Sequence, residues 1–119
     1  EWLLARQRDD GGWGEDGATY YVNRRSEAKA STASQTSWAI LGLIAAGEAD
    51  NAAVASGVRF LTEAPRRGDK WDEPWHTAVG FPRVFYLRYH GYSAYFPLWA
   101  LARYRNLRKG NSRAVTFGM

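Results

Sequence analysis

Two stretches of the chain share one pattern of residue types, and this internal repeat constrains the fold more than any other feature. The first stretch, WLLARQRDDGGWGED, starts at Trp2, and the second, FLTEAPRRGDKWDEP, starts at Phe60. Each opens with an aromatic–aliphatic pair, crosses a polar loop and reaches a Trp followed by acidic residues. The interval from Trp2 to Trp13 equals that from Phe60 to Trp71. A helix–loop unit that recurs in this way favours an array of stacked helical units.

The residues between the two copies predict two helices joined by a short turn. The first helix covers residues 30–46, with Ser31 or Thr32 as its N-cap. The second starts with a cap at Asp50 and ends at Pro65, which cannot continue a helix. Together they are expected to form an antiparallel helical hairpin.

The residues after the second copy predict two more helices and little sheet. Residues 80–92 form the third helix, which Gly91 breaks, and residues 95–107 form the fourth, with Pro97 in its first turn. The expected fold is therefore all-α, as part of an α/α barrel (toroid) of helical hairpins. Residues 1–107 belong to that barrel domain, and residues 108–119 form a C-terminal tail.

Composition excludes several kinds of site. The chain of 119 residues has no Cys, so it has neither disulfides nor a thiolate zinc site. His76 and His90 lack the paired spacing of a zinc protease, and no Ser lies in a nucleophile elbow. The acidic residues of the first copy do not match a calcium loop and are interpreted as solvated carboxylates: Asp9, Asp10, Glu15 and Asp16. We expect no metal, no cofactor and no hydrolase.

Charge and termini suggest a few further expectations. The net charge of +4 arises largely from Arg and Lys in the C-terminal half. Such residues could meet nucleic acid or anionic lipid, but solvated helix ends explain them more simply, and no nucleic-acid partner is expected. No apolar segment approaches the roughly 20 residues of a spanning helix. The chain opens with Glu1 rather than Met, which suggests a piece of something longer.

The repeated loop predicts a clamp between neighbouring helices. The amide of Gln7 can bond to unpaired carbonyls at a helix end or to N–H groups that open the next helix. Trp13 can lie over that amide, while Gly11 lets the backbone pass closely. The alternative is a polar turn with a chance aromatic. Two copies at matching offsets favour the clamp.

Four aromatic residues form a second pattern. Phe81, Phe85, Tyr89 and Tyr92 recur at helical spacing, which predicts one face of one helix. Such a stripe could simply be core. The alternative is a cavity lined by π faces, which attract a cation through their quadrupoles without capturing it covalently.

In their order, the segments RQRDDGGWGED, ASTASQTSWAILGLIAAG, WDEPWHTAVGFPRVFYLRYHGY and YFPLWALARYRNL resemble the C-terminal end of bacterial squalene-hopene cyclases. The repeated loop resembles the QW motif of that family. The first copy matches it fully through Trp2, Leu3, Gln7, Gly11 and Trp13.

The second copy departs from the motif. Phe60, Leu61 and Trp71 fit, but Pro65 occupies the Gln position and Asp69 the Gly position, with Gly68 one place early. Because Pro offers neither a side-chain amide nor an N–H, this clamp is expected to be weaker.

The resemblance implies a triterpene cyclase of two α/α barrels, attached to one leaflet of the bacterial cytoplasmic membrane on its cytoplasmic side. In the family, a D-x-D-D motif protonates squalene, and a carbocation cascade in an aromatic-lined cavity yields hopene or hopanol. Phe81, Phe85, Tyr89 and Tyr92 fall on positions that line this cavity. The motif does not occur in these 119 residues, so the catalytic acid is expected elsewhere. Alone, the chain should be inactive and should self-associate.

Other interpretations remain open. A related cyclase could act on another linear polyprenoid or on an oxidosqualene. A non-catalytic helical interaction module would use Trp and Tyr to bind a partner or a glycan, and it predicts exposed aromatics on loops rather than a stripe that faces inward. A protein prenyltransferase subunit needs a zinc site built with Cys, which this chain lacks.

Overall fold

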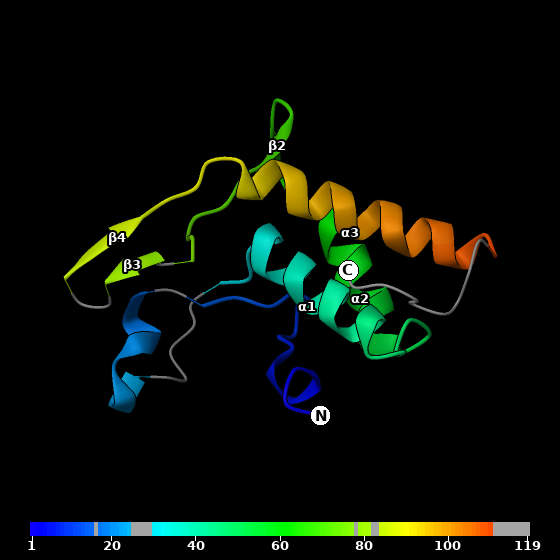
Figure 1. Cartoon of the computed structure of the whole chain (residues 1–119), viewed down its shortest axis with the longest axis horizontal. Helices are drawn as coiled ribbons and strands as arrows, with labels where there is room; N and C mark the ends of the chain where they lie inside the picture. The colour runs from blue at the N-terminus through cyan, green and yellow to red at the C-terminus, as the bar shows by residue number, and fades with distance from the viewer. Residues whose placement is uncertain (16, 25–29, 78, 82–83, 111–119) are drawn as a thin grey trace.

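The computed structural model describes residues 1–15, 17–24, 30–77, 79–81 and 84–110 (Figure 1). Three α-helices, three short 3₁₀ helices and two small β-hairpins follow one another along this part of the chain. The N-terminal portion contains the 3₁₀ helices η1 (Leu4–Arg6), η2 (Gly17–Tyr20) and η3 (Val22–Arg24). The predicted mostly helical fold is confirmed, and the three α-helices do not by themselves close a barrel.

Helix α1 (Ala33–Ala45) lies at the centre of the core and packs against both other α-helices. Thr32 is its N-cap, as predicted, because Thr32 Oγ1 accepts a hydrogen bond of 3.3 Å from the Gln35 backbone N–H. The side chains of Ile40 and Leu41 are fully buried. Hydroxyl-bearing residues in the first half of α1 are buried as well, so this helix has almost no solvent-facing side.

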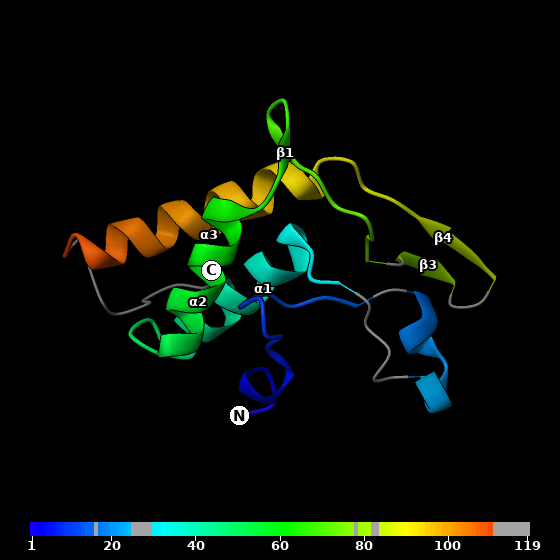
Figure 2. The same ribbon diagram turned by 180° about the vertical axis from the view of Figure 1, so that it is seen from behind.

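Helix α2 (Ala52–Glu63) lies behind α1 in the view of Figure 1 and in front in Figure 2. Its cap is Asn51, whose Oδ1 accepts from the Ala53 N–H at 2.9 Å, so the predicted cap at Asp50 is wrong. Asp50 instead accepts a 2.7 Å hydrogen bond from Arg108 Nη1 at the end of α3. The predicted end before Pro65 is confirmed, and the two-residue strands β1 (Arg66–Arg67) and β2 (Lys70–Trp71) follow.

The predicted helix over residues 80–92 is wrong. Strands β3 (Val79–Phe81) and β4 (Phe85–Leu87) form an antiparallel hairpin in which Phe81 is paired with Phe85. Gly80 has a φ of +127°, outside the helical region, and aromatic and β-branched residues favour strands. Figure 1 shows this hairpin extending away from the three helices. Pro82 lies outside the described residues.

Helix α3 (Tyr92–Arg108) begins directly after Gly91, which was predicted to interrupt a helix and in fact marks its start. Because α3 starts earlier than the predicted residue 95, Pro97 lies in its second turn rather than its first. Pro97 and Ala100 are fully buried, and this side of α3 packs across α1. Residues 111–119 are outside the described part of the chain, so the tail stays a prediction.

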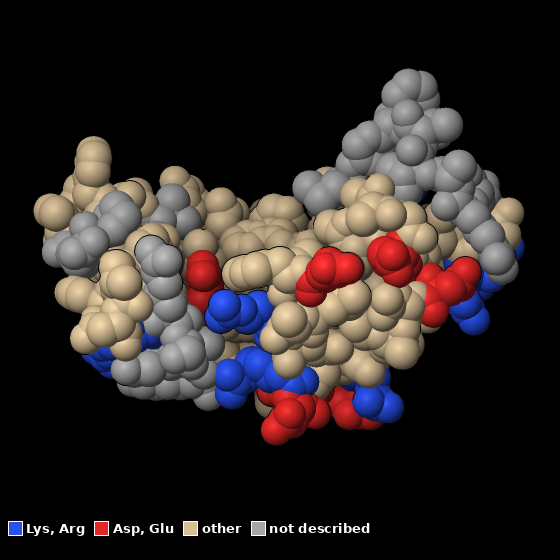
Figure 3. All heavy atoms as spheres, turned by 90° about the horizontal axis from the view of Figure 1, so that it is seen from below, with Lys and Arg blue, Asp and Glu red and all other residues tan. Residues whose placement is uncertain are grey.

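Charges of both signs occur together on the surface. In Figure 3, Lys and Arg lie beside Asp and Glu across the face shown, which is therefore not uniformly basic. Arg83 and Arg113, which contribute to the net charge, are outside the described residues. Within the part of the chain that the structure describes, no helix has the length and apolarity needed to span a bilayer.

Candidate helix clamps and aromatic surface

The first repeat copy (residues 2–13) connects the N-terminal segment to α2. Gln7 Nε2 donates hydrogen bonds of 2.8 Å to the Gly11 carbonyl and 2.8 Å to the Ala53 carbonyl. Ala53 lies in the first turn of α2, so Gln7 reaches the opening of a helix. The group it meets there is a carbonyl rather than an N–H. The amide therefore closes its own loop and attaches that loop to α2.

Trp13 attaches the same loop to α1. Its Nε1 donates to the Leu3 carbonyl at 2.8 Å, and its backbone N–H donates to Thr36 Oγ1 at 2.9 Å. The Trp13 carbonyl accepts from the Thr32 N–H at 2.9 Å and from Thr36 Oγ1 at 3.2 Å. The indole is buried in the core. Both polar groups of the Trp13 backbone and its ring N–H therefore have partners, as burial requires.

The second repeat copy (residues 60–71) reproduces the indole bond but not the amide bonds. Trp71 Nε1 donates to the Leu61 carbonyl at 2.8 Å, the same relation that Trp13 has to Leu3. Pro65 stands in the Gln position, and its carbonyl accepts from the Asp72 N–H at 2.9 Å. The Arg66 guanidinium lies 4.2 Å from the centre of the Trp71 ring. A cation–π contact thus covers this indole.

The glycines of the two copies differ in their surroundings. Gly11 has a φ of +84°, and a Cβ there would lie 2.8 Å from the Ser56 carbonyl oxygen of α2. Gly68 has a φ of +64° in the tight turn between β1 and β2, with nothing within 4 Å of such a Cβ. Asp69, at the Gly position of the second copy, is exposed, so a side chain is accommodated there.

The aromatic members of the two pairs also differ. Trp2 is 68% exposed, whereas Phe60 is half-buried and packs against the hydrophobic core. Leu3 is likewise half-buried, and Leu61 is fully buried. In both copies, the aliphatic residue supplies the carbonyl that the Trp indole binds.

Two polar side chains, those of Glu73 and Gln35, bond at the start of α1, and neither contact was predicted from the sequence. Buried Glu73 accepts a short hydrogen bond from the Ser34 N–H, which is one of the unpaired donors of the first turn. Gln35 Oε1 accepts from the Glu15 N–H at 2.8 Å, and its Nε2 donates to Thr77 Oγ1 at 3.0 Å. Glu73 follows Trp71 at the offset at which Glu15 follows Trp13, and that repeat signal could have identified it.

The acidic residues of the first copy are solvent-exposed where the structure describes them. Asp10 also organises the loop, since its Oδ1 accepts from the Gly12 N–H at 2.9 Å and from Ser31 Oγ at 2.7 Å. Asp16 lies outside the described residues. Among the described residues, no three potential metal ligands gather at one place.

The four aromatic residues predicted to share one helix face form two separate pairs. Phe81 and Phe85 meet edge-to-face across the β3–β4 hairpin, with ring centres 5.3 Å apart. Tyr89 and Tyr92 stack at 5.1 Å just before and at the start of α3. Phe81, Phe85 and Tyr89 are 65%, 46% and 50% exposed. They are therefore neither a helical stripe nor part of the buried core of this chain.

The Tyr89–Tyr92 pair extends into a larger aromatic group that the sequence did not indicate. Trp38 of α1 meets Tyr92 edge-to-face at 5.4 Å and Phe96 at 5.2 Å. Phe96 in turn stacks with Trp99 at 6.1 Å. Trp38 was not among the site residues predicted from the sequence. We refer to Trp38, Tyr89, Tyr92, Phe96 and Trp99 as the aromatic group.

A further ring contact joins the N-terminal part to the β3–β4 hairpin. Tyr20 of η2 stacks with Tyr86 of β4 at 6.0 Å. Burial raises the pKa of Tyr20, and the nearby Glu15 carboxylate and Tyr86 raise it further, so its hydroxyl is neutral at pH 7. Tyr86 lies on β4, the strand that also carries the predicted site residue Phe85.

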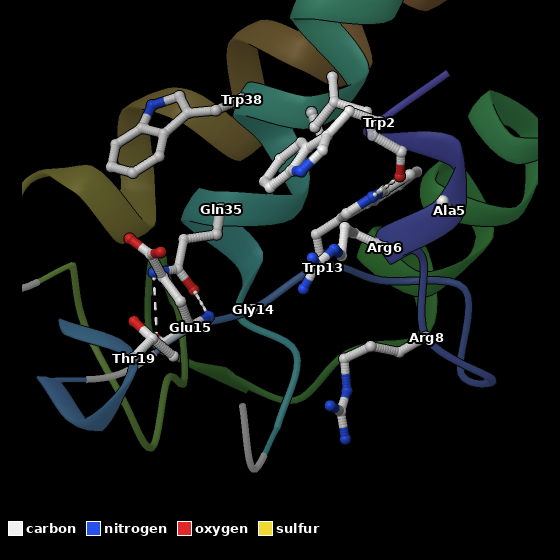
Figure 4. A pocket seen from close by; sticks show the side chains of 12 residues that line it. Trp2, Ala5, Arg6, Arg8, Trp13, Gly14, Glu15, Thr19, Gln35 and Trp38 are labelled. Carbon is white, nitrogen blue, oxygen red and sulfur yellow. Dashed lines mark hydrogen bonds between the residues drawn. The ribbon is translucent and has the colours of Figure 1, made fainter. Parts of the chain in front are cut away.

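A hollow of about 680 Å³ lies between the N-terminal segment and α1 (Figure 4). Figure 4 shows Trp2 and Trp38 at its upper rim, Arg8 at its lower end, and Gln35 bonded to Glu15 at its side. None of the four predicted cavity residues lines this hollow. Trp38 borders both the hollow and the aromatic group.

Comparison with known proteins gives consistent matches. The family model described as the squalene-hopene cyclase C-terminal domain matches residues 1–106. A squalene–hopene cyclase of Bradyrhizobium diazoefficiens is 60% identical over 100% of this chain and 18% of its own length. A squalene–hopene cyclase of Zymomonas mobilis is 54% identical over 99% of this chain and 18% of its own length.

A more distant relative is the lanosterol synthase of Homo sapiens, which is 36% identical over 90% of this chain and 14% of its own length. The chain therefore spans less than a fifth of the length of the curated relatives that it matches.

Proposed function

The chain belongs to the squalene-hopene cyclase C-terminal domain family, and from this membership we propose that it is part of a triterpene cyclase that converts squalene into hopene or hopanol. The observation that carries the proposal is the 60% identity to a squalene–hopene cyclase along the whole chain. Its proposed partners are a linear polyprenoid substrate and the remainder of the cyclase.

In this proposal, the aromatic rings stabilise positive charge during the cascade. Ring closure from squalene moves a carbocation along a hydrocarbon, and a carboxylate near it would capture it as an ester. A π face instead attracts a cation by about 0.5–2 kcal/mol without bonding to it. We assign this role to Phe81, Phe85, Tyr89 and Tyr92. Family membership supports the assignment. The exposure of the first three rings makes them accessible to a ligand but is also what the interaction module predicts, so it does not separate the two interpretations.

The two repeat copies have a structural role in the proposal. A cavity that holds a reacting cation must keep its wall in place through a strongly exothermic cascade. The bonds from Gln7 and Trp71 attach loops to the backbone of α2, and those from Trp13 attach its loop to Leu3 and to α1. Together they would hold the wall.

We also propose that the complete enzyme attaches to one leaflet of the bacterial cytoplasmic membrane on its cytoplasmic side. The proposed substrate supports this, because squalene is a lipid-soluble hydrocarbon that the enzyme would take from the membrane. The chain by itself is expected to self-associate through exposed apolar side chains on β4 and α3. Leu87, Tyr95 and Leu98 are 48%, 72% and 64% exposed.

The experiment uses a chimera. The segment of the Bradyrhizobium relative that this chain matches is replaced by the chain itself, and squalene is supplied in detergent. Gas chromatography with mass spectrometry should then detect polycyclic triterpenes. Phe85→Ala should reduce their formation by about tenfold or more, while Val84→Ala, at the exposed neighbouring position, serves as the matched control.

A folded chimera that leaves squalene unchanged would contradict the proposal and favour a non-catalytic helical interaction module. The chain alone is expected to give no product. Product from the chain alone would show that the catalytic acid lies within these residues, contrary to our assignment.

A second candidate substrate is an oxidosqualene, which a related cyclase of this fold would take. The chain is 60% identical to a squalene–hopene cyclase and 36% identical to a lanosterol synthase, which favours squalene. Supplying the chimera with equal amounts of squalene and an oxidosqualene measures the preference directly. Preferential consumption of the oxidosqualene would reverse the substrate assignment and leave the cyclase assignment intact.

A further inference from the structure

Resting on the proposed cyclase function, we propose that Trp38 is a positioning residue that fixes the ring plane of Tyr92 within the cation-stabilising wall. Trp38 does not belong to the four residues assigned to that wall. Its indole meets the Tyr92 ring nearly perpendicularly, at 81°, with the ring centres 5.4 Å apart. Such an edge-to-face pair has a preferred geometry and therefore resists rotation of either ring.

The three ring neighbours of Tyr92 differ in what they can hold in place. Tyr89 stacks on Tyr92 but precedes α3 and is 50% exposed. Phe96 meets Tyr92 at 5.2 Å but belongs to the same helix and moves with it. Trp38 alone among these three comes from another element, α1. It therefore sets the ring of Tyr92 relative to the core rather than relative to α3.

The backbone that carries Trp38 is firmly held. Trp38 lies between Ser37 and Ala39, both of which are buried, in the most buried helix of the described chain. Ser37 Oγ donates to the Ala33 carbonyl one turn earlier. Trp38 itself is half-buried and also meets Phe96 edge-to-face. The buried helix therefore gives the indole a fixed point of attachment, which a positioning residue requires.

The orientation of Tyr92 matters because a cation is attracted to the face of a ring and not to its edge. A ring that rotates presents its edge for part of the time, and the neighbouring carbocation then loses stabilisation. The cascade would stop early more often, by loss of a proton from an intermediate with fewer rings. Removal of Trp38 should therefore change which products form as well as how fast squalene is consumed.

The test uses the chimera described above, with Trp38→Leu, Trp38→Phe and the control Trp99→Leu. Trp99 stacks with Phe96, as part of the same aromatic group, but among the described residues no ring contact joins it to Tyr92. Trp38→Leu should raise the share of incompletely cyclised products at least about threefold. Trp38→Phe keeps a ring edge at this position and should stay within about twofold of the parent. Trp99→Leu should leave the product proportions unchanged.

Several outcomes would overturn the inference. Parental product proportions in a folded Trp38→Leu chimera would show that Tyr92 needs no positioning by the indole. An equal shift in Trp99→Leu would mean that any loss of packing has this effect. Should Trp38→Leu fail to fold, Trp38→Met decides by the same measurement, since it retains apolar volume without a ring.

Failure of the inference is distinguishable from failure of the proposed function. A folded parental chimera that consumes no squalene contradicts both. An active parental chimera whose products do not respond to Trp38→Leu contradicts only the role of Trp38.

Discussion

The two repeat copies share one hydrogen bond of the Trp indole and differ in their other contacts. In both, a buried Trp indole donates to the carbonyl of the aliphatic residue ten positions earlier, at 2.8 Å. The first copy adds two amide bonds from Gln7 and a close approach of Gly11 to α2. The second copy has Pro65 and a cation–π contact from Arg66 instead.

The difference indicates which part of the loop is indispensable. The indole bond survives in a copy that has lost both the Gln and the Gly of the motif. The amide and the glycine are used only where the loop must attach to a second helix, as the first copy attaches to Ala53 and Ser56 of α2. The second copy has no such neighbour at Gly68, where the turn between β1 and β2 is open, although β2 itself packs against α3.

The largest effect is expected from removal of either indole. Trp13→Ala and Trp71→Ala should each lower the free energy of unfolding by about 3–5 kcal/mol, since each deletes a buried aromatic side chain and its hydrogen bond. Denaturant unfolding measures both. Trp2→Ala, at an exposed Trp of the same loop, is the control and should cost about 1 kcal/mol or less.

A cost below about 1 kcal/mol for Trp71→Ala, together with the full cost for Trp13→Ala, would break the comparison. It would mean that the second copy keeps the pattern of the motif without its structural role.

The next effect distinguishes the two glycines. Gly11→Ala places a Cβ 2.8 Å from a backbone oxygen of α2 at a positive φ, so strain and overpacking add. We expect a loss of about 2–4 kcal/mol. Gly68→Ala introduces only the strain of a positive φ, about 1–2 kcal/mol, because its surroundings are open. Equal losses in denaturant unfolding would show that α2 does not constrain the first loop.

The sequence predicted the helical hairpin well, because its signals are local. Thr32 and Pro65 act through their own backbone neighbourhood, and both marked a boundary of α1 or α2 correctly. The choice between Asp50 and Asn51 as the cap of α2 could not be made locally. It depends on Arg108, which is far along the chain and donates a hydrogen bond to Asp50.

The aromatic residues show where sequence reasoning failed. A spacing of four, four and three residues fits one helix face, but Gly80 at a positive φ allows the chain to fold back as a hairpin instead. Trp38 was missed because the pattern of its own helix does not show which residues of other elements it meets. It lies within α1, and only the packing of α3 across α1 brings it to Tyr92.

A smaller effect is expected from the amide of the first copy. Gln7→Ala removes both donors of the side chain and leaves the Gly11 and Ala53 carbonyls without these bonds. The expected loss is about 1–3 kcal/mol in the free energy of unfolding. Pro65→Ala changes the matching position of the second copy, where no side-chain bond is lost, and should cost less than about 1 kcal/mol. A loss from Pro65→Ala that equals the loss from Gln7→Ala would contradict the distinction between the copies.

The smallest effect concerns the contact that replaces the amide. Arg66→Ala removes the guanidinium 4.2 Å from the Trp71 ring and should cost about 0.5–1 kcal/mol, because Arg66 is exposed and water screens its charge. The adjacent Arg67 forms an exposed ion pair of 3.5 Å with Asp72, so Arg67→Ala is the matched control for loss of a positive charge.

The contacts of Arg66 and Arg67 differ in what they do to the Trp71 indole. Arg66→Ala should expose the Trp71 ring to water and change its fluorescence emission, whereas Arg67→Ala should not. If both variants alter the emission alike, the guanidinium of Arg66 acts only as a nearby charge. The second copy then depends on its indole bond alone.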